Sequence, residues 1–188
     1  MAELNAPLFR GLLQGMEDDA RRVVLDLGPA RSATVATFGR FRCRLEITDL
    51  GAAVDTLNAT EETAELRAAL RALLPPSRPE ATDLVLCWDL LNYLEPPVLK
   101  ALMDEIQSRL RPGSLVHALI AYSTPRMPAR PQHITPTPGY GLEIVPLDGA
   151  ERAARRYTPD ELGRLMGGYV VERAMLLKNG MQEFLFRH

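Results

Sequence analysis

The chain has 188 residues, enough for one domain with a buried core, and a formal net charge of -2. Hydrophobic residues make up 46% and charged residues 24%, a balance that excludes a disordered or fibrous chain. Because the chain has no excess of positive charge, its composition gives no electrostatic reason to expect nucleic acid as a partner.

The amino-terminal segment, residues 1–21, is predicted to contain an amphipathic helix over Leu4 to Met16. Its apolar residues recur three and four positions apart, so they share one face of a helix. These residues are Leu8, Phe9, Leu12, Leu13 and Met16. The segment lacks the basic start and long apolar core of a secretion signal, and no stretch reaches the roughly 18 apolar residues of a membrane span. We therefore expect a cytoplasmic protein.

The next elements are two predicted strands joined by a short helix. Residues 22–27 (RVVLDL) form an apolar run closed by glycine, which indicates a buried strand. Residues 32–38 are small and apolar and predict a helix, with Ser32 as its amino-terminal cap. Residues 41–48 (FRCRLEIT) alternate apolar and polar side chains, which predicts a strand with one wetter face.

Helix and strand continue to alternate in the middle of the chain. Helices are predicted over 60–74, which Pro75 and Pro76 stop, and over 97–110, which starts with proline in its first turn. Apolar strands are predicted over 83–88 (DLVLCW) and 114–121 (SLVHALIA). This alternation predicts a parallel sheet wrapped by helices.

The last third begins with residues 124–138, whose many prolines predict a long loop, either a functional flap or disordered. Residues 141–146 form a candidate strand, and a capping box from Thr158 to Glu161 opens a short helix. Two final strands meet at Asn179-Gly180, a strong hairpin signal. The predicted fold class is α/β: one domain over residues 1–188, with a mainly parallel sheet and a carboxyl-terminal antiparallel hairpin.

Ligands of open parallel sheets bind at the carboxyl ends of the strands. Gly28 follows the first predicted strand, where backbone can approach a ligand closely. Asp49 ends the second strand, about twenty residues on, where a carboxylate can accept hydrogen bonds from a ribose diol. Ala30 and Ser32 stand where further glycines are expected, so a tight turn without a ligand is the alternative.

Four blocks of sequence follow one another in a characteristic order: VVLDLGPARSA, LEITDL, DLVLCWDLLNYLEPPVLKALMDEIQSRLRPGSLVHAL and RYTPDELGRLMGGYVVERAMLLKNGMQEFLFRH. They resemble the blocks of a Rossmann-like, class I S-adenosylmethionine-dependent methyltransferase. The resemblance runs from about Arg22 to the end, and its third block is the most specific. It implies S-adenosylmethionine as the cofactor and a last strand that lies antiparallel between two others.

The resemblance also implies roles for individual residues. Asp26 and Gly28 match the acid and first glycine of the cofactor loop, Ala30 and Ser32 match later glycines from which they depart, and Asp49 matches the acid that holds the ribose. Trp88 and Asp89 match a segment that lines the methyl-transfer site and complete the cofactor-binding set. The candidate substrate contacts are Asn92, Tyr93, Tyr122 and His133.

Between Asp49 and Asp83 the chain departs from the family's pattern. The family has a helix, a third strand ending in an acid that holds the adenine, and another helix, whereas this segment offers one good helix. We therefore expect the third strand to be short, irregular or missing. Asp55 is the only acid near the adenine position.

Two classes of function stay open. One is methyl transfer to a small molecule or a protein side chain, which positioning can catalyse without a nucleophile. No catalytic residue is identified, because a base is needed only when the acceptor has a proton to lose; Tyr93, His117 and His133 are candidates. The other is a non-catalytic binding or scaffold module that has lost the full cofactor site. A dehydrogenase is weaker, because Arg31-Ser32 leaves little room for a pyrophosphate.

Cysteine usage and charge limit the other partners. Cys43 and Cys87 fall in separate predicted strands, which favours buried free thiols over a disulfide or a metal clip. We expect no metal, no nucleic acid and no membrane partner. A homo-oligomer stays open.

Overall fold

The computed structural model describes residues 2–145, 147 and 149–188, and at its centre lies a six-stranded sheet in the order β10-β11-β5-β4-β2-β3. The parallel strands are β2 (Arg22–Asp26), β3 (Cys43–Ile47), β4 (Thr82–Trp88) and β5 (Leu110–Ala121). The antiparallel hairpin consists of β10 (Val170–Leu176) and β11 (Met181–Arg187), and β11 pairs with β5. The predicted last strand between two others is thus confirmed.

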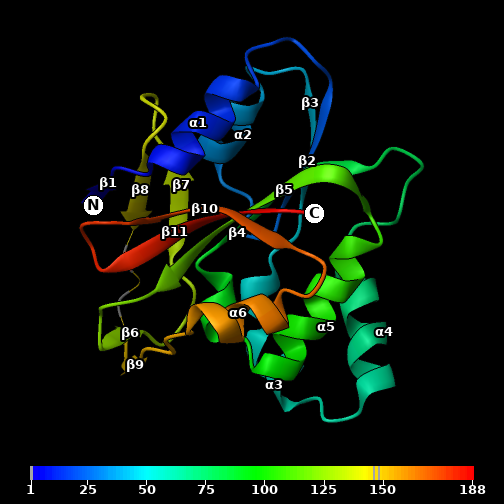
Figure 1. Ribbon diagram of the computed structural model, residues 1–188, viewed down its shortest axis with the longest axis vertical. Coiled ribbons are helices and arrows are strands. Elements are labelled where there is room, and N and C mark those ends of the chain that lie inside the picture. Colours follow the sequence, from blue (N-terminus) through cyan, green and yellow to red (C-terminus); the bar gives the residue numbers. More distant parts are fainter. Residues whose placement is uncertain (1, 146, 148) are drawn as a thin grey trace.

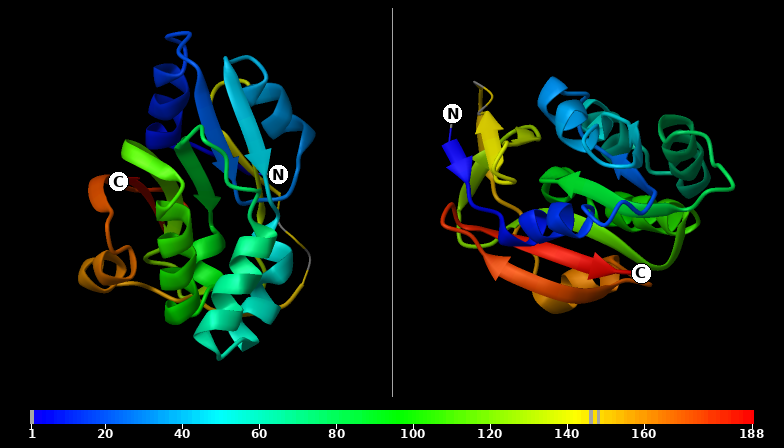
Figure 2. Two further views of the ribbon diagram at one scale, coloured as in Figure 1. Left: turned by 90° about the vertical axis from the view of Figure 1, so that its right-hand side faces the viewer. Right: turned by 90° about the horizontal axis from the view of Figure 1, so that it is seen from above.

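Helices cover both faces of the central sheet (Figures 1 and 2). One face is covered by α3 (Val54–Ala59), α4 (Thr63–Leu73), α5 (Pro96–Gln107) and α6 (Pro159–Leu165), whose apolar residues form one core cluster. The other is covered by α1 (Pro7–Gly15), α2 (Ser32–Phe38) and a small sheet of β1 (Ala2–Leu4), β8 (Leu142–Val145) and β7 (His133–Pro136). The predicted α/β class is confirmed.

The segment between β3 and β4, whose residues are all described, contributes helices but no strand to the central sheet. It forms the 3-10 helix η1 (Leu50–Ala53), then α3 and α4, and it adds no strand among the residues described. Of the three expected forms of the third strand, short, irregular or missing, the described residues show the last, and β3 is the edge of the sheet. The predicted alternation is confirmed, because Phe41, Cys43 and Leu45 pack against a core cluster while the polar side carries ion pairs that leave it half-buried. In these pairs Arg44 lies 3.1 Å from Glu46 and 2.5 Å from Glu80.

The proline-rich segment 124–138 differs from the predicted loop, because it contains β6 (Arg126–Pro128) and β7. Pro128 and Pro136 are tolerated because β6 and β7 are edge strands, where a missing N–H costs little. Strand β6 pairs with β9 (Glu151–Ala153) and β7 pairs with β8. Residues 129–132 are therefore a short connection that is anchored by strand pairing at both ends.

Several local predictions are corrected or confirmed. Helix α1 begins at Pro7 rather than Leu4, because the preceding residues pair with β8 as strand β1. Ser32 is the first residue of α2 and does not cap it. Cys43 is half-buried rather than buried. The capping box of Thr158 and Glu161 is present, and the Asn-Gly hairpin forms with Gly180 at a positive φ of 82°.

Helix α1 is fixed to the sheet by a buried carboxylate. Glu183 of β11 accepts hydrogen bonds from the backbone N–H groups of Leu8 (3.0 Å) and Phe9 (2.7 Å), and α1 has no side-chain cap of its own. Its Oε1 also lies 2.9 Å from Nε2 of His117, and both side chains are 0% exposed. His117 therefore lies beneath α1. We considered this residue as a catalytic base, but in the structure it helps to anchor the helix.

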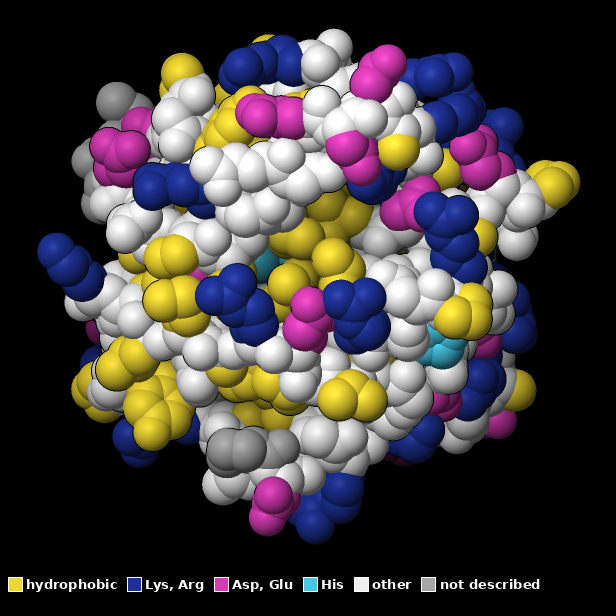
Figure 3. Space-filling view, turned by 45° about the horizontal axis from the view of Figure 1, so that its top comes forward, with side chains coloured by type: hydrophobic (Ala, Val, Ile, Leu, Met, Phe, Trp, Pro, Cys, Tyr) yellow, Lys and Arg dark blue, Asp and Glu magenta, His cyan; other side chains and the backbone are white. Residues whose placement is uncertain are grey.

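The surface carries charges of both signs. On the face shown in Figure 3, basic and acidic side chains are interspersed around a central hollow lined by apolar side chains. This face shows no continuous basic patch, in keeping with the net charge of -2. Among the described residues, each helix is too short or too polar to cross a lipid bilayer.

Candidate functional site

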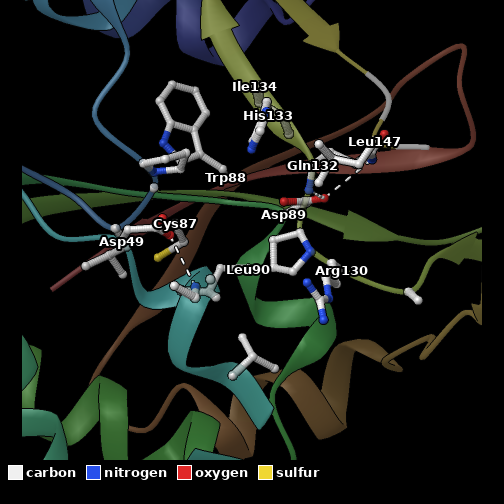
Figure 4. Close-up of a pocket in the computed structure, with 18 of the residues that line it drawn as sticks. Asp49, Cys87, Trp88, Asp89, Leu90, Arg130, Gln132, His133, Ile134 and Leu147 are labelled. Atoms are coloured by element: carbon white, nitrogen blue, oxygen red, sulfur yellow. Dashed lines mark hydrogen bonds between the residues drawn. The ribbon is translucent and has the colours of Figure 1, made fainter. Parts of the chain in front are cut away.

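A cavity of about 260 Å³ lies where the order of the parallel strands reverses, at the carboxyl ends of β2, β3 and β4. Its floor consists of Leu27, Gly28 and Pro29 after β2, Asp49, Gly51, Ala52, Val54 and Asp55 after β3, and Cys87, Trp88, Asp89 and Leu90 at the end of β4. Residues 129–134, with Leu147, form its roof (Figure 4). This is the place in which open α/β sheets bind their ligands.

The turn after β2 is built around the indole of Trp88. Oδ1 of Asp26 accepts hydrogen bonds from the Gly28 N–H (2.8 Å) and from Nε1 of Trp88 (2.6 Å). A Cβ atom at Gly28 would come within 2.8 Å of Cδ1 of Trp88, so the glycine is needed for this close packing. Burial raises the pKa of Asp26 to about 6, although its two hydrogen bonds oppose the shift. Asp26 therefore shapes the site by holding Gly28 and Trp88.

Replacing Gly28 by alanine is expected to destabilise the fold by about 1–3 kcal/mol, because the added methyl group displaces the Trp88 indole. Urea denaturation measures the loss, and the fluorescence of Trp88, the one tryptophan of the chain, reports its displacement. Gly11→Ala is the matched control, since its Cβ meets no atom within 4 Å and the substitution should stabilise α1 by up to ~1 kcal/mol. An unchanged stability of the Gly28 variant would contradict this account of the turn.

Asp49 stands at the rim of the cavity with an exposed side chain. Its Oδ1 accepts a hydrogen bond of 3.3 Å from the N–H of Ala52 and caps η1. Its other oxygen makes no hydrogen bond within the described residues, so it can accept from a ligand. The apolar side chains of Val54 and Leu90 line the same cavity. The rim thus combines an acceptor for hydroxyl groups with a surface for a flat apolar group.

Asp89 joins the floor of the cavity to its roof. Its Oδ2 accepts from the backbone N–H of Gln132 (3.0 Å), from Nε2 of Gln132 (3.4 Å) and from the Tyr93 hydroxyl (3.4 Å). Figure 4 shows Gln132 beside Asp89, and Asp49 on the other side of the cavity. Burial raises the pKa of Asp89 to about 6, even though the hydrogen bonds from Gln132 lower it. All three donors meet one oxygen, which leaves Oδ1 as an acceptor.

A second contact fixes the roof to the turn after β2. Nη2 of Arg31 makes a short contact with Nδ1 of His133. Burial, and then the charge of Arg31, lower the pKa of His133, so the imidazole is neutral at pH 7. Since Arg31 can only donate, Nδ1 accepts and we assign the ring proton to Nε2.

The structure brings five of the predicted site residues to the cavity: Gly28, Asp49, Trp88, Asp89 and His133. Asp55, expected near the adenine, lines it as well. Ala30 and Ser32 are exposed and lie outside the lining, because the chain turns away into α2 after Pro29. Asp26 also lies outside the lining and accepts a hydrogen bond from Trp88, which does line the cavity.

The remaining predicted contacts also lie outside the lining. Asn92, at 0% exposure, donates to the carbonyls of Asp89 and Leu119 (2.7 Å each) and accepts from the Ala121 N–H, so it ties two strand ends together. Tyr93 is buried and reaches the site only through its hydrogen bond to Asp89. Tyr122 is 50% exposed.

Sequence reasoning missed Arg130, Pro131 and Gln132, and it missed that Cys87 lines the cavity. Proline content marked this segment as a flap but singled out none of these residues, because their partners lie far away in the chain. Burial raises the pKa of the Cys87 thiol, so the group is protonated and inert at neutral pH. The described residues contain no cluster of His, Cys, Asp and Glu that could hold a metal ion.

No known protein family and no curated protein matches this chain. Solved structures do. The chain is similar to the 1,6-didemethyltoxoflavin-N1-methyltransferase of Burkholderia thailandensis, solved with 1,6-didemethyltoxoflavin and S-adenosylhomocysteine. The two are 17% identical over 96% of this chain and 76% of the other, with a TM-score of 0.55.

Two further solved structures are similar. The glycopeptide N-methyltransferase MtfA in complex with S-adenosylhomocysteine is 13% identical over 96% of this chain and 88% of its own, with a TM-score of 0.53. The magnesium protoporphyrin IX methyltransferase of Synechocystis, with bound S-adenosylmethionine, is 9% identical over 95% and 76% of the two chains, with a TM-score of 0.52. At such low identity these similarities establish the fold alone.

Proposed function

We propose that this chain, whose fold is that of the class I S-adenosylmethionine-dependent methyltransferases, binds S-adenosylmethionine in the cavity and transfers its methyl group to an acceptor. One observation carries the proposal: Gly28, Asp49 and Trp88 meet around an open cavity at the point where the strand order reverses. The bound cofactors of the similar structures support it.

The residues of the cavity fit this cofactor. Asp49 offers the acceptor that a ribose diol needs, beside the apolar side chains of Val54 and Leu90, which suit an adenine. Gly28, with the Trp88 indole packed against it, lines the cavity where the sulfur end would approach. Side chains line this cavity without filling it, which favours an enzyme over a scaffold module that has lost its site.

When bound, S-adenosylmethionine would supply an electrophilic sulfonium methyl for transfer to an acceptor lone pair, with the sulfur keeping the bonding electrons. The protein's part is to orient the reactants and to limit the access of water, and the roof formed by residues 129–134 serves the second purpose. We assign the proton of an O–H or N–H acceptor to Oδ1 of Asp89, because the three hydrogen bonds to this carboxyl all go to Oδ2. With a pKa of about 6 the carboxyl is mostly ionised at pH 7 and basic enough to accept it.

The proposal also covers the methyl acceptor, the location of the protein and its domain organisation. We propose that the acceptor is a small molecule or a protein side chain and that the reaction takes place in the cytoplasm. The two core clusters lie on opposite faces of one central sheet, which supports a single domain over residues 1–188.

Isothermal titration calorimetry of the protein with S-adenosylmethionine and S-adenosylhomocysteine tests the proposal. We expect one ligand per chain, with a dissociation constant on the order of micromolar, and a rise in melting temperature by linkage. No heat and no thermal shift at millimolar ligand would overturn the enzyme proposal in favour of the scaffold module.

A further inference from the structure

Arg31 carries a guanidinium without a matching anion. It lies in the turn between β2 and α2, next to residues that line the cavity. Its Nε is buried and has no hydrogen-bond partner, and its Nη2 contacts Nδ1 of His133. In the part of the chain that the structure describes, no carboxylate lies within ion-pair distance of Arg31.

Another arginine of the same fold shows what this edge of a guanidinium binds. Nε of Arg21 donates to Oε1 of Glu80 (2.7 Å) and its Nη2 donates to Oε2 (3.2 Å), so two parallel bonds hold one carboxylate. Arg31 presents the same two donors, one without a partner and one facing a neutral imidazole. Both donors would be satisfied at once by the two oxygens of a carboxylate, with the stronger, charge-assisted bonds.

The position of Arg31 indicates where that carboxylate comes from. Pro29, two residues before Arg31, and His133, which Arg31 contacts, both line the cavity, and Arg31 itself lies just outside the lining. Gly28, which lines the cavity, lies in the same turn. A ligand that enters the cavity with its adenosine over Asp49 would extend its opposite end toward this turn.

We propose that Arg31 binds the carboxylate of the cofactor's amino-acid part side-on, through Nε and Nη2, in exchange for its contact with His133. This inference rests on the proposed function and adds a binding residue to it. Ala30 and Ser32 leave the turn with one glycine, and the charge of Arg31 supplies affinity that the backbone of a glycine-rich loop would otherwise provide. A carboxylate on the acceptor is the other source of the same chemistry, and the experiment separates the two.

Calorimetry with two nucleosides tests the proposal. S-adenosylhomocysteine carries the amino-acid carboxylate, and 5′-methylthioadenosine has the same thioadenosine without it. Arg31→Met should weaken binding of S-adenosylhomocysteine by about tenfold to a hundredfold, the loss of a charge-assisted pair, and leave 5′-methylthioadenosine within about twofold. Arg31→Lys keeps the positive charge but loses the paired N–H donors of the guanidinium. Its affinity for S-adenosylhomocysteine should lie between those of the wild-type protein and Arg31→Met. Arg10→Met, at an exposed arginine of α1, controls for the loss of one positive charge.

The outcomes are distinct. If the wild-type protein binds both nucleosides and Arg31→Met weakens neither, Arg31 does not bind the carboxylate of the cofactor, and the proposal is wrong. Arg31 would then bind a carboxylate of the acceptor or no carboxylate at all. If Arg31→Met and Arg31→Lys weaken both nucleosides alike, Arg31 only supports the turn, which also overturns it. If the wild-type protein binds neither nucleoside, the proposed function fails first. Thermal melting of each variant checks that it is folded.

Discussion

Replacing Asp49 by asparagine is expected to weaken binding of S-adenosylhomocysteine by about tenfold or more, because hydrogen bonds from two ribose hydroxyls to a charged acceptor are lost. Asparagine keeps an oxygen for the Ala52 N–H, so the start of η1 stays intact. The ribose is common to both nucleosides, and 5′-methylthioadenosine should therefore weaken by the same factor. Calorimetry with the two ligands measures both effects.

Glu61→Gln is the matched control for the Asp49 variant, since it removes an exposed acid that lies outside the lining of the cavity. We expect a smaller change for it. An equal loss in both variants would show that the ligand responds to the overall charge of the protein, and an unchanged affinity of Asp49→Asn would show that the ribose lies elsewhere. Together with Arg31→Met, which affects only the ligand that carries a carboxylate, these variants map the two ends of the bound molecule separately.

Replacing Glu183 by glutamine is expected to lower the free energy of unfolding by about 3–5 kcal/mol at pH 7. The carboxylate accepts hydrogen bonds from the backbone N–H groups of Leu8 and Phe9 and bonds to His117. In the glutamine variant one carboxylate oxygen is replaced by an NH₂ group, which is a donor and cannot accept these hydrogen bonds. Urea denaturation at pH 7 measures the loss. Glu172→Gln, at an ion pair with Arg187 on the exposed strand β10, is the control and should cost less than about 1 kcal/mol.

The effect of Glu183 should depend on pH. Burial acts to raise the pKa of this carboxyl, but the hydrogen bond and charge of His117, with the two backbone N–H groups, outweigh it and lower the pKa. A lowered pKa gives stability that is present above the ordinary glutamate value of about 4.3 and is lost as the pH falls through the folded-state value. The wild-type protein and the variant should thus converge in stability at acidic pH. A constant difference would show that Glu183 acts by packing alone.

The local pattern of the chain was sufficient for most of the fold. Apolar spacing in α1, α4 and α5, the capping box at Thr158 and the turn at Asn179-Gly180 act through neighbours a few positions apart, and each element formed. The lack of a regular third strand was also predictable, because the segment after Asp49 offers one good helix, whereas its complete absence was one of three forms that stayed open. The edge position of β3 was not, since burial depends on what lies beside a strand.

The sequence by itself determined the α/β architecture, the Gly28 turn and the acid at Asp49, because strand ends and their polar residues are encoded locally. Only the tertiary structure decided what surrounds them. It placed Trp88 on Gly28, fixed the roof to Asp89 through Gln132, left Arg31 without an anion and buried His117 under α1. Each of these contacts joins residues dozens of positions apart, and the free energy that selects them comes from packing and desolvation, which no local pattern records.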